Sequence, residues 1–174
     1  FVSDYHARDH VTRAELALDA QGHFLGLRVS TLAAVGAYVS TVGAAVPTTV
    51  YTAVLSGPYR IPAIHAEVRA MFTNTVPTDA YRGAGRPEAC FVLERLVEEA
   101  SRQLNIDRME LRRRNFIPAA AMPYSTPVGP TYDTGDFVRL FDRVLVLADY
   151  AGFEKRRLET QARGRIRGFG ICYF

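Results

Sequence analysis

The sequence of 174 residues has only two cysteines, no run of about 18 uncharged apolar residues, and no basic or apolar leader at its start. Cys90 and Cys172 are too few and too far apart for a disulfide framework or a Cys-x-x-Cys metal site. We therefore expect both thiols to be buried and inert. The missing apolar run excludes a membrane-spanning helix, and nothing at the start directs export. These absences predict a soluble, cytoplasmic protein with no membrane partner.

Lysine is almost absent, because Lys155 is the only one among the 21 basic residues. Arginine therefore carries the net charge of +3, and its planar fork suits phosphate and carboxylate. The one basic run, residues 112–114, lies in a helical pattern beside acidic residues and has no interleaved aromatic side chains. It matches no nucleic-acid module. We expect no nucleic-acid partner.

Alternating apolar and polar residues predict strands over residues 11–19, 24–30 and 65–75. Turn residues at 19–22 join the first two strands into a β-hairpin. The small residues from 32 to 50 have no clear period and fit a loop or a short helix. The ending, residues 167–174, resembles a buried strand that returns to the sheet.

Helical periodicity begins at Pro87, where the amphipathic pattern continues to about Leu104. Asp107 and Glu110 match a capping box that opens a short helix through Asn115. A proline-rich crossing, residues 118–135, precedes two further helices over 136–150 and 153–162. The first of these two is expected to bury Phe137, Leu140, Phe141, Val144, Leu147 and Ala148. Three to four helices packed on a sheet predict an α+β fold, with residues 1–174 forming a single domain.

Residues 78–88, Thr-Asp-Ala-Tyr-Arg-Gly-Ala-Gly-Arg-Pro-Glu, form a glycine-containing loop that leads directly into the first predicted helix. Gly83 and Gly85 permit positive φ angles and a close approach of a ligand to the backbone. The helix that follows directs its free amides and positive dipole end toward the loop. Pro87 and Glu88 suit the first helical turn. The loop is therefore a candidate anion site, although an ordinary loop-to-helix junction fits the same letters.

Known nucleotide-binding loops do not match this stretch. A P-loop requires Gly-Lys-Ser/Thr, whereas Gly85 is followed by Arg86 and Pro87. A dinucleotide fingerprint requires a third glycine where Glu88 stands. Asp79 could orient Arg82 or the loop amides, or it could accept a hydrogen bond from its own backbone in an Asx turn.

The chain resembles the molybdenum hydroxylase large subunits, the family of xanthine dehydrogenase, aldehyde oxidase and aerobic carbon monoxide dehydrogenase. Its loop Ala-Tyr-Arg-Gly-Ala-Gly-Arg, residues 80–86, matches the form II carbon monoxide dehydrogenase-like members without a departure. Further similar segments are spread over essentially the whole chain: Gly36-Ala37-Tyr38, Leu55-Ser56-Gly57, Asn74-Thr75, Glu94-Arg95, residues 110–118, Tyr132-Asp133, residues 135–137 and Arg163-Gly164.

This resemblance implies a molybdenum-pyranopterin cofactor, in the cytosine dinucleotide form, in an oxidoreductase that hydroxylates a small-molecule carbon substrate with oxygen from water. Arg82 and Gly83 would be the cofactor-binding residues, and Ala84 and Gly85 would lie on the substrate side. No side chain here would bind the metal directly. Ala84 stands where purine enzymes carry a phenylalanine, which argues against purine recognition. Gly83 stands where carbon monoxide dehydrogenases carry the cysteine that binds copper, so carbon monoxide oxidation is not expected.

The resemblance also implies that the chain is an internal fragment. The general-base glutamate and other cofactor contacts belong to segments outside residues 1–174, so we expect no catalytic residue here and neither cofactor nor turnover in the isolated fragment. The implied partners are the remainder of the large subunit and iron–sulfur and FAD subunits. The alternative is a non-catalytic interaction domain in which the glycine loop serves only to lead into a helix.

Overall fold

A computed structural model describes residues 4–174. Its sheet contains β1 (His10–Leu18), β2 (Phe24–Gly36) and β3 (Ile64–Phe72), in that order. The first two strands pair antiparallel and form the predicted hairpin, whereas β3 lies parallel to β2. The carboxylate of Asp19 stabilises the hairpin turn by accepting hydrogen bonds from the amides of Gln21 and His23, at 2.9 and 2.8 Å.

Strand β2 continues to Gly36, six residues beyond the predicted end at Ser30. The extension enters the small-residue stretch that was expected to be a loop or a short helix. Ala33 pairs with His10 of β1 on one side and with Ala70 of β3 on the other. Hydrogen bonding to two neighbours therefore determines the conformation where the side chains give no clear pattern. Only the later part of the stretch contains a short helical turn, η1 (Val46–Val50).

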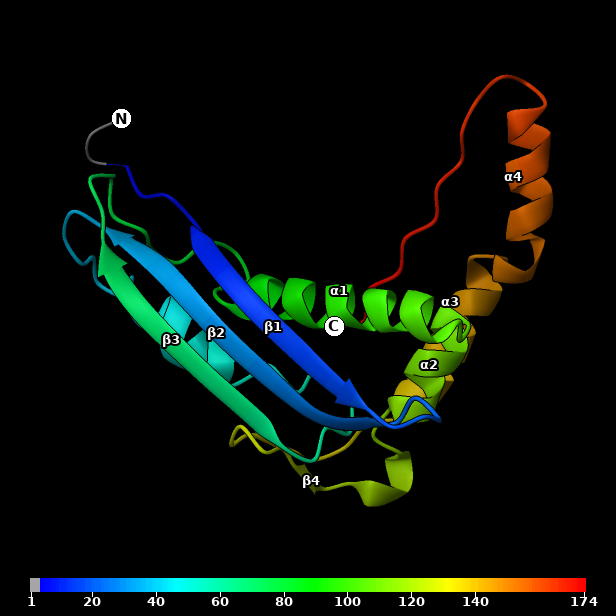
Figure 1. Cartoon of the computed structure of the whole chain (residues 1–174), viewed down its shortest axis with the longest axis horizontal. Helices are drawn as coiled ribbons and strands as arrows, with labels where there is room; N and C mark the ends of the chain where they lie inside the picture. Colours follow the sequence, from blue (N-terminus) through cyan, green and yellow to red (C-terminus); the bar gives the residue numbers. More distant parts are fainter. Residues whose placement is uncertain (1–3) are drawn as a thin grey trace.

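Helix α1 (Arg86–Leu104) lies across one face of the sheet (Figure 1). Leu93 and Val97 of α1 and Leu27 and Val29 of β2 belong to one buried apolar cluster. Further members of the cluster come from the connection after η1 and from the segment around the second helix: Tyr51, Leu55, Tyr59, Leu111 and Phe116. This core sets the position of the N-terminal end of α1, where the glycine loop enters.

The other predicted helices form as α2 (Arg108–Asn115), α3 (Phe137–Leu147) and α4 (Phe153–Gln161). Asp107 caps α2 by accepting hydrogen bonds from the amides of Met109 and Glu110. The proline-rich crossing contains a small antiparallel pair, β4 (Tyr124–Ser125) and β5 (Thr131–Tyr132), that periodicity did not predict. The strands lie mainly in the first part of the chain and the helices mainly in the second, so the fold is α+β. No helix within residues 4–174 has both the length and the apolarity needed to cross a membrane.

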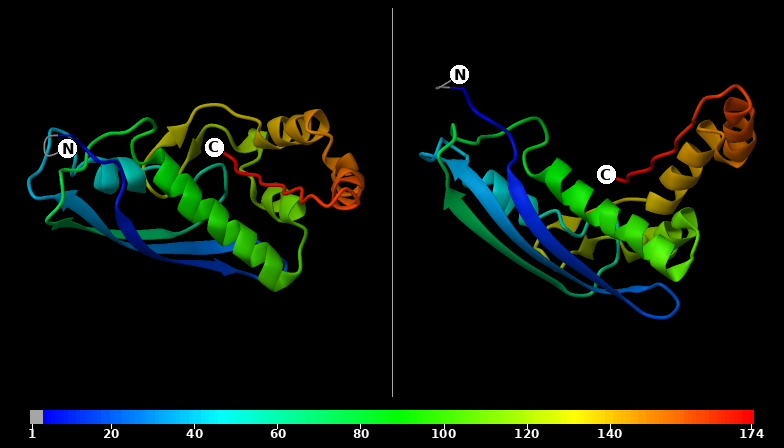
Figure 2. Two further views of the ribbon diagram at one scale, coloured as in Figure 1. Left: turned by 90° about the horizontal axis from the view of Figure 1, so that it is seen from above. Right: turned by 45° about the horizontal axis from the view of Figure 1, so that its top comes forward.

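The predicted buried face of α3 is partly wrong. Phe141 is buried, but Leu140, Val144 and Leu147 are 54%, 46% and 70% exposed. Helices α3 and α4 extend away from the sheet (Figure 2), so only a narrow stripe of α3 reaches the core. That stripe consists of Phe137, Val138, Phe141 and Leu145. Helical period alone could not tell that the core covers so little of this helix.

The prediction of a final strand is also wrong. Residues 165–174 have no regular secondary structure and pair with no strand. The segment instead runs back from α4 toward α1, and the hydroxyl of Tyr173 donates a hydrogen bond of 3.1 Å to the carbonyl of Phe137. Alternating apolar residues resemble a strand, but a strand also needs a free sheet edge beside it.

Candidate functional site

The glycine loop begins at Thr78, which lies beside the N-terminal segment, and ends in the first turn of α1. Gly83, Ala84 and Gly85 have φ angles of 97°, 37° and 82°. Three successive residues therefore have left-handed backbone conformations, which glycine adopts readily and alanine does not. Strain of this kind at Ala84 is common at functional sites.

Both glycines are required by contacts within the chain itself. A Cβ atom at Gly83 would lie 2.6 Å from Cγ of Pro87, and one at Gly85 would lie 2.7 Å from the backbone nitrogen of Tyr51 and 2.8 Å from the carbonyl oxygen of Val46. Gly85 is buried and forms the N-cap of α1, whereas Gly83 is exposed. The predicted positive φ angles of both glycines are confirmed. The other predicted reason, close approach of a ligand, is not needed for Gly85, because close packing of the loop already explains it.

Several backbone amides of the loop are free to donate hydrogen bonds. The amide of Ala84 donates to the carbonyl of Tyr81 at 2.7 Å, and the amide of Arg86 donates to the carbonyl of Gly83 at 3.2 Å. Within residues 4–174, by contrast, the amides of Tyr81, Arg82, Gly83 and Gly85 have no acceptor, and the first three belong to exposed residues. Arg82 and Gly83, the two residues predicted to bind the cofactor, are therefore adjacent, accessible hydrogen-bond donors.

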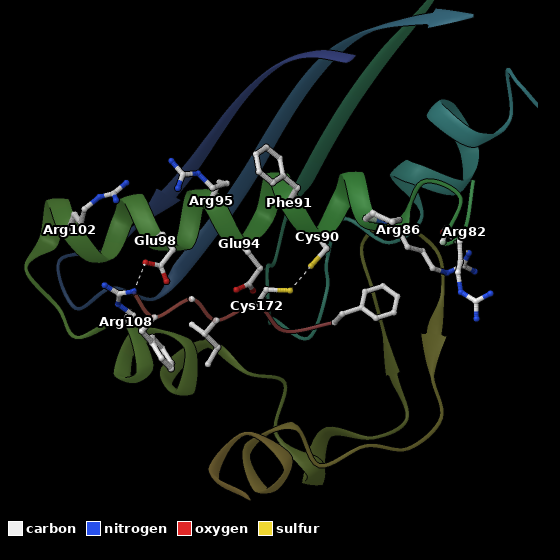
Figure 3. Close-up of a pocket in the computed structure, with 16 residues that line it drawn as sticks. Arg82, Arg86, Cys90, Phe91, Glu94, Arg95, Glu98, Arg102, Arg108 and Cys172 are labelled. Carbon is white, nitrogen blue, oxygen red and sulfur yellow. Dashed lines mark hydrogen bonds and ion pairs between the residues drawn. The ribbon is translucent and has the colours of Figure 1, made fainter. Parts of the chain in front are cut away.

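A cavity of about 750 Å³ extends from this loop along α1 to the C-terminal segment. Arg82 and Arg86 lie at the loop end in Figure 3, whereas Arg102 and Arg108 lie at the opposite end of the helix. Cys90 and Cys172 meet in the middle, with their Sγ atoms 3.4 Å apart. Cys172 is exposed, which corrects the prediction that both thiols are buried. Burial and the neighbouring thiol raise the pKa of Cys90 to about 12, so the inert thiol form is favoured there.

The basic run of α2 has a structural role. Arg112 is fully buried and binds Glu94, with Nη2 2.8 Å and Nε 3.0 Å from the same carboxylate oxygen. The hydroxyl of Tyr59 donates to the other oxygen of Glu94 at 2.5 Å, and burial raises the pKa of Tyr59 well above its usual range. Arg113 pairs with Asp142 of α3, and Arg114 pairs with Glu110 within α2 and donates a hydrogen bond to the carbonyl of Gln21 in the hairpin turn. All three arginines thus hold elements together.

Two further residues have positions that the sequence did not settle. Asp79 accepts a hydrogen bond of 2.5 Å from the amide of the next residue, Ala80. This local contact is one residue short of an Asx turn, and within the described residues Asp79 makes no hydrogen bond to Arg82. Arg8 was not predicted to belong to the site, yet its Nη2 donates a hydrogen bond of 3.0 Å to the carbonyl of Arg82. No local pattern could have identified Arg8, because 74 residues separate the two.

Known proteins are similar to this chain in sequence and in fold. It is 34% identical, over 97% of its length, to the gamma subunit of the 6-hydroxypseudooxynicotine dehydrogenase complex of Paenarthrobacter nicotinovorans, and 37% identical, over the same share, to the carbon monoxide dehydrogenase large chain of Hydrogenophaga pseudoflava. It covers 22% of each of these relatives, about a fifth of their length. The crystal structure of quinoline 2-oxidoreductase from Pseudomonas putida 86 superposes on 94% of this chain and 21% of that one, with a TM-score of 0.83 and 30% identity.

The family model described as the molybdopterin cofactor-binding domain matches residues 1–116, which include the sheet, the glycine loop and the whole of α1. The matched residues are two thirds of the chain and contain the free amides of the loop. The chain therefore belongs to the molybdopterin cofactor-binding domain family.

Proposed function

We propose that this chain is the cofactor-lining domain of a molybdenum hydroxylase large subunit, and that the amides of Arg82 and Gly83 hold the molybdenum-pyranopterin group. The observation that carries the proposal is that the amides of these two exposed residues, and of Tyr81 before them, have no acceptor within the described residues. Oxo and dithiolene groups accept hydrogen bonds, so the donor set fits such a group. Fixed amide donors of this kind stabilise negative charge without having to reorganise.

When bound, the group supplies hydroxylation of a substrate carbon with oxygen from water. The chain's own contribution is to bind and orient: the left-handed backbone at residues 83–85 presents the amides, and Arg82 and Arg86 add positive charge beside them. Ala84 and Gly85 are proposed to shape the substrate side. With no thiolate at Gly83 and no aromatic ring at Ala84, we propose a small carbon substrate other than carbon monoxide or a purine.

The rest of the proposal concerns the whole protein. We propose that residues 1–174 act as one domain in a longer large subunit, which works in the cytoplasm with iron–sulfur and FAD subunits. The cofactor is proposed to be the cytosine dinucleotide form. The multi-subunit name of the Paenarthrobacter relative supports partners of this kind, and general acid–base chemistry would come from segments outside this chain.

The proposal can be tested in the intact subunit with the substitution Gly83→Ala. Gly83 has a φ of 97°, and a Cβ atom there would lie too close to Pro87, so the substitution would force the loop to move. We therefore expect the molybdenum content, measured by mass spectrometry, to fall about tenfold. Gly164→Ala is the matched control, because Gly164 also has a positive φ, 70°, but no atom lies within 4 Å of its Cβ position. Equal molybdenum content in both variants would contradict the proposal.

A separate test uses the isolated chain. We expect purified residues 1–174 to contain no stoichiometric molybdenum and to show no dye-linked turnover, since a loop exposed on one side cannot exclude water or complete the ligand set. Metal analysis and a dye-reduction assay measure both quantities. Stoichiometric molybdenum in this preparation would overturn the view that other segments complete the site.

The rival function, a non-catalytic interaction domain, has one observation in its favour. Gly85 caps α1 and packs against the backbone of Val46 and Tyr51, as a simple helix lead-in would. It does not explain why the amides of Arg82 and Gly83 remain exposed without an acceptor in the described chain. We therefore favour the cofactor function.

A further inference from the structure

The N-terminal segment before β1 lies directly beside the start of the glycine loop. His6 forms a parallel bridge with Thr78, its amide donates to the carbonyl of Pro77 at 3.0 Å, and the amide of Asp79 donates to the carbonyl of His6 at 3.0 Å. This pairing brings Arg8 to the loop from a distant part of the sequence.

Arg8 makes three contacts there. Its Nη2 donates to the carbonyl oxygen of Arg82 at 3.0 Å, its Nε lies 2.8 Å from Oε1 of Glu88, and its guanidinium lies 5.2 Å from the ring centroid of Tyr81. Glu88 belongs to the first turn of α1, and its side chain is only 7% exposed. One guanidinium therefore ties the loop before the glycines to the helix after them.

The carbonyl that Arg8 binds belongs to the same peptide group as the amide of Gly83. Because a peptide group is planar, fixing the direction of its C=O also fixes the direction of its N–H. Glycine restricts its own backbone little, so Gly83 needs an external contact to keep this plane in one orientation. Arg8 provides that contact, and Glu88 holds the guanidinium in place.

Arg8 itself has a φ angle of 36°, a left-handed conformation that costs free energy for a residue with a side chain. A lysine could replace its charge beside Glu88, but a single ammonium group lacks the planar fork that reaches two acceptors in fixed directions. The geometry thus requires arginine rather than positive charge alone.

We propose that Arg8 is a positioning residue that orients the Gly83 amide toward the cofactor. The proposal rests on the proposed function, because it assumes that this amide contacts the molybdenum-pyranopterin group. It predicts that the loop loses order, and the metal site changes, when the fork is removed but the charge is kept.

The test compares Arg8→Lys and Arg8→Ala with the matched control Arg13→Ala in the intact subunit. Arg13 lies on β1, has a side chain that is 84% exposed, and among residues 4–174 forms an ion pair with Glu15 alone. Hydrogen–deuterium exchange of the peptide containing residues 80–86 reports loop order without any need for the cofactor. The electron paramagnetic resonance spectrum of the molybdenum centre, and kcat measured separately from KM, report the site.

We expect both Arg8 variants to exchange faster in this peptide, to shift the spectrum and to lower kcat about tenfold with little change in KM. Arg13→Ala should match the wild type. Arg8→Lys keeps the ion pair with Glu88, so it gives a folded variant if Arg8→Ala does not fold.

Unchanged exchange and an unchanged spectrum in Arg8→Lys would overturn the proposal, provided that Gly83→Ala still alters the spectrum. If Gly83→Ala also leaves molybdenum content and spectrum unchanged, the proposed function itself fails, and the role of Arg8 toward the cofactor fails with it. The two failures are therefore distinguished by the Gly83 variant.

Discussion

Arg112 carries a charge although it is fully buried, and Glu94 compensates it. Removing a charge from water costs several kcal/mol, which is recovered only when geometry and hydrogen bonding are good. Here the guanidinium donates twice to Glu94, and Tyr59 satisfies the second carboxylate oxygen. The pair connects α1 to α2, so it stabilises the helix that carries the glycine loop.

Replacing Glu94 tests this network. Glu94→Ala leaves Arg112 without its main partner and should lower the free energy of unfolding by about 3–5 kcal/mol, measured by urea denaturation. Glu99→Ala removes an exposed partner of Arg102 on the same helix and should leave the urea concentration at the midpoint of unfolding unchanged. Similar midpoints for the two variants would show that the buried pair does not stabilise the fold.

The two thiols should differ in reactivity. The pKa of Cys90 is raised to about 12, so at pH 8 almost none of it is the nucleophilic thiolate. Cys172 is exposed, and iodoacetamide should modify it first. Peptide mass spectrometry over time measures both rates, and faster modification of Cys90 would contradict the assignment.

At the scale of elements, the C-terminal segment shows how a chain without regular structure is held in place. Tyr173 lies 5.1 Å from Phe116 and 6.0 Å from Phe137, measured between ring centroids, and its hydroxyl binds the carbonyl of Phe137. Ile166, nearer α4, is 99% exposed. Phe169 packs in the same way, 5.1 Å from Tyr150 and 5.3 Å from Phe153 between ring centroids. Two aromatic anchors therefore determine where residues 165–174 lie, and with them one wall of the cavity beside the loop.

Tyr173→Ala should release this segment. Loss of the ring contacts and one hydrogen bond should reduce the local opening free energy by about 1–3 kcal/mol, so the backbone amides of residues 170–174 should exchange with deuterium faster. Phe174→Ala is the control, because Phe174 is 79% exposed. Equal exchange rates in the two variants would exclude Tyr173 as an anchor.

At the scale of the whole molecule, helices α3 and α4 extend away from the sheet (Figure 1), and several apolar side chains of α3 are uncovered. Val146 and Leu147 are 71% and 70% exposed. Clustered apolar side chains of this kind promote association, whereas the sheet and α1 share a continuous core. Apolar side chains are thus buried between the sheet and α1, whereas several on α3 are exposed to solvent.

The uncovered surface of α3 leads to a prediction for the isolated chain. It should self-associate at high concentration, and Val146→Glu should lower the sedimentation coefficient at that concentration by weakening the contact. Arg143→Gln changes the net charge by the same amount on an exposed residue of the same helix and should have no such effect. Equal behaviour of both variants would attribute association to charge instead.

The sequence alone determined those features that depend on near neighbours. The cap at Asp107, the hairpin and the start of α1 were predictable, because capping and periodicity act within a few residues. The letters of the glycine loop also indicated the family. Periodicity also located α3 correctly, but it could not predict which face of α3 the core covers.

Tertiary structure decided the features that join distant segments. The contact of Arg8 with Arg82 spans 74 residues, that of Cys90 with Cys172 spans 82, and the packing of Gly85 against Val46 and Tyr51 depends on how η1 meets the loop. Tertiary structure also decided the conformation of the final segment, whose alternating apolar residues are typical of a strand but which has no free sheet edge beside it. Such contacts follow from the packing of the whole chain, which no local pattern encodes.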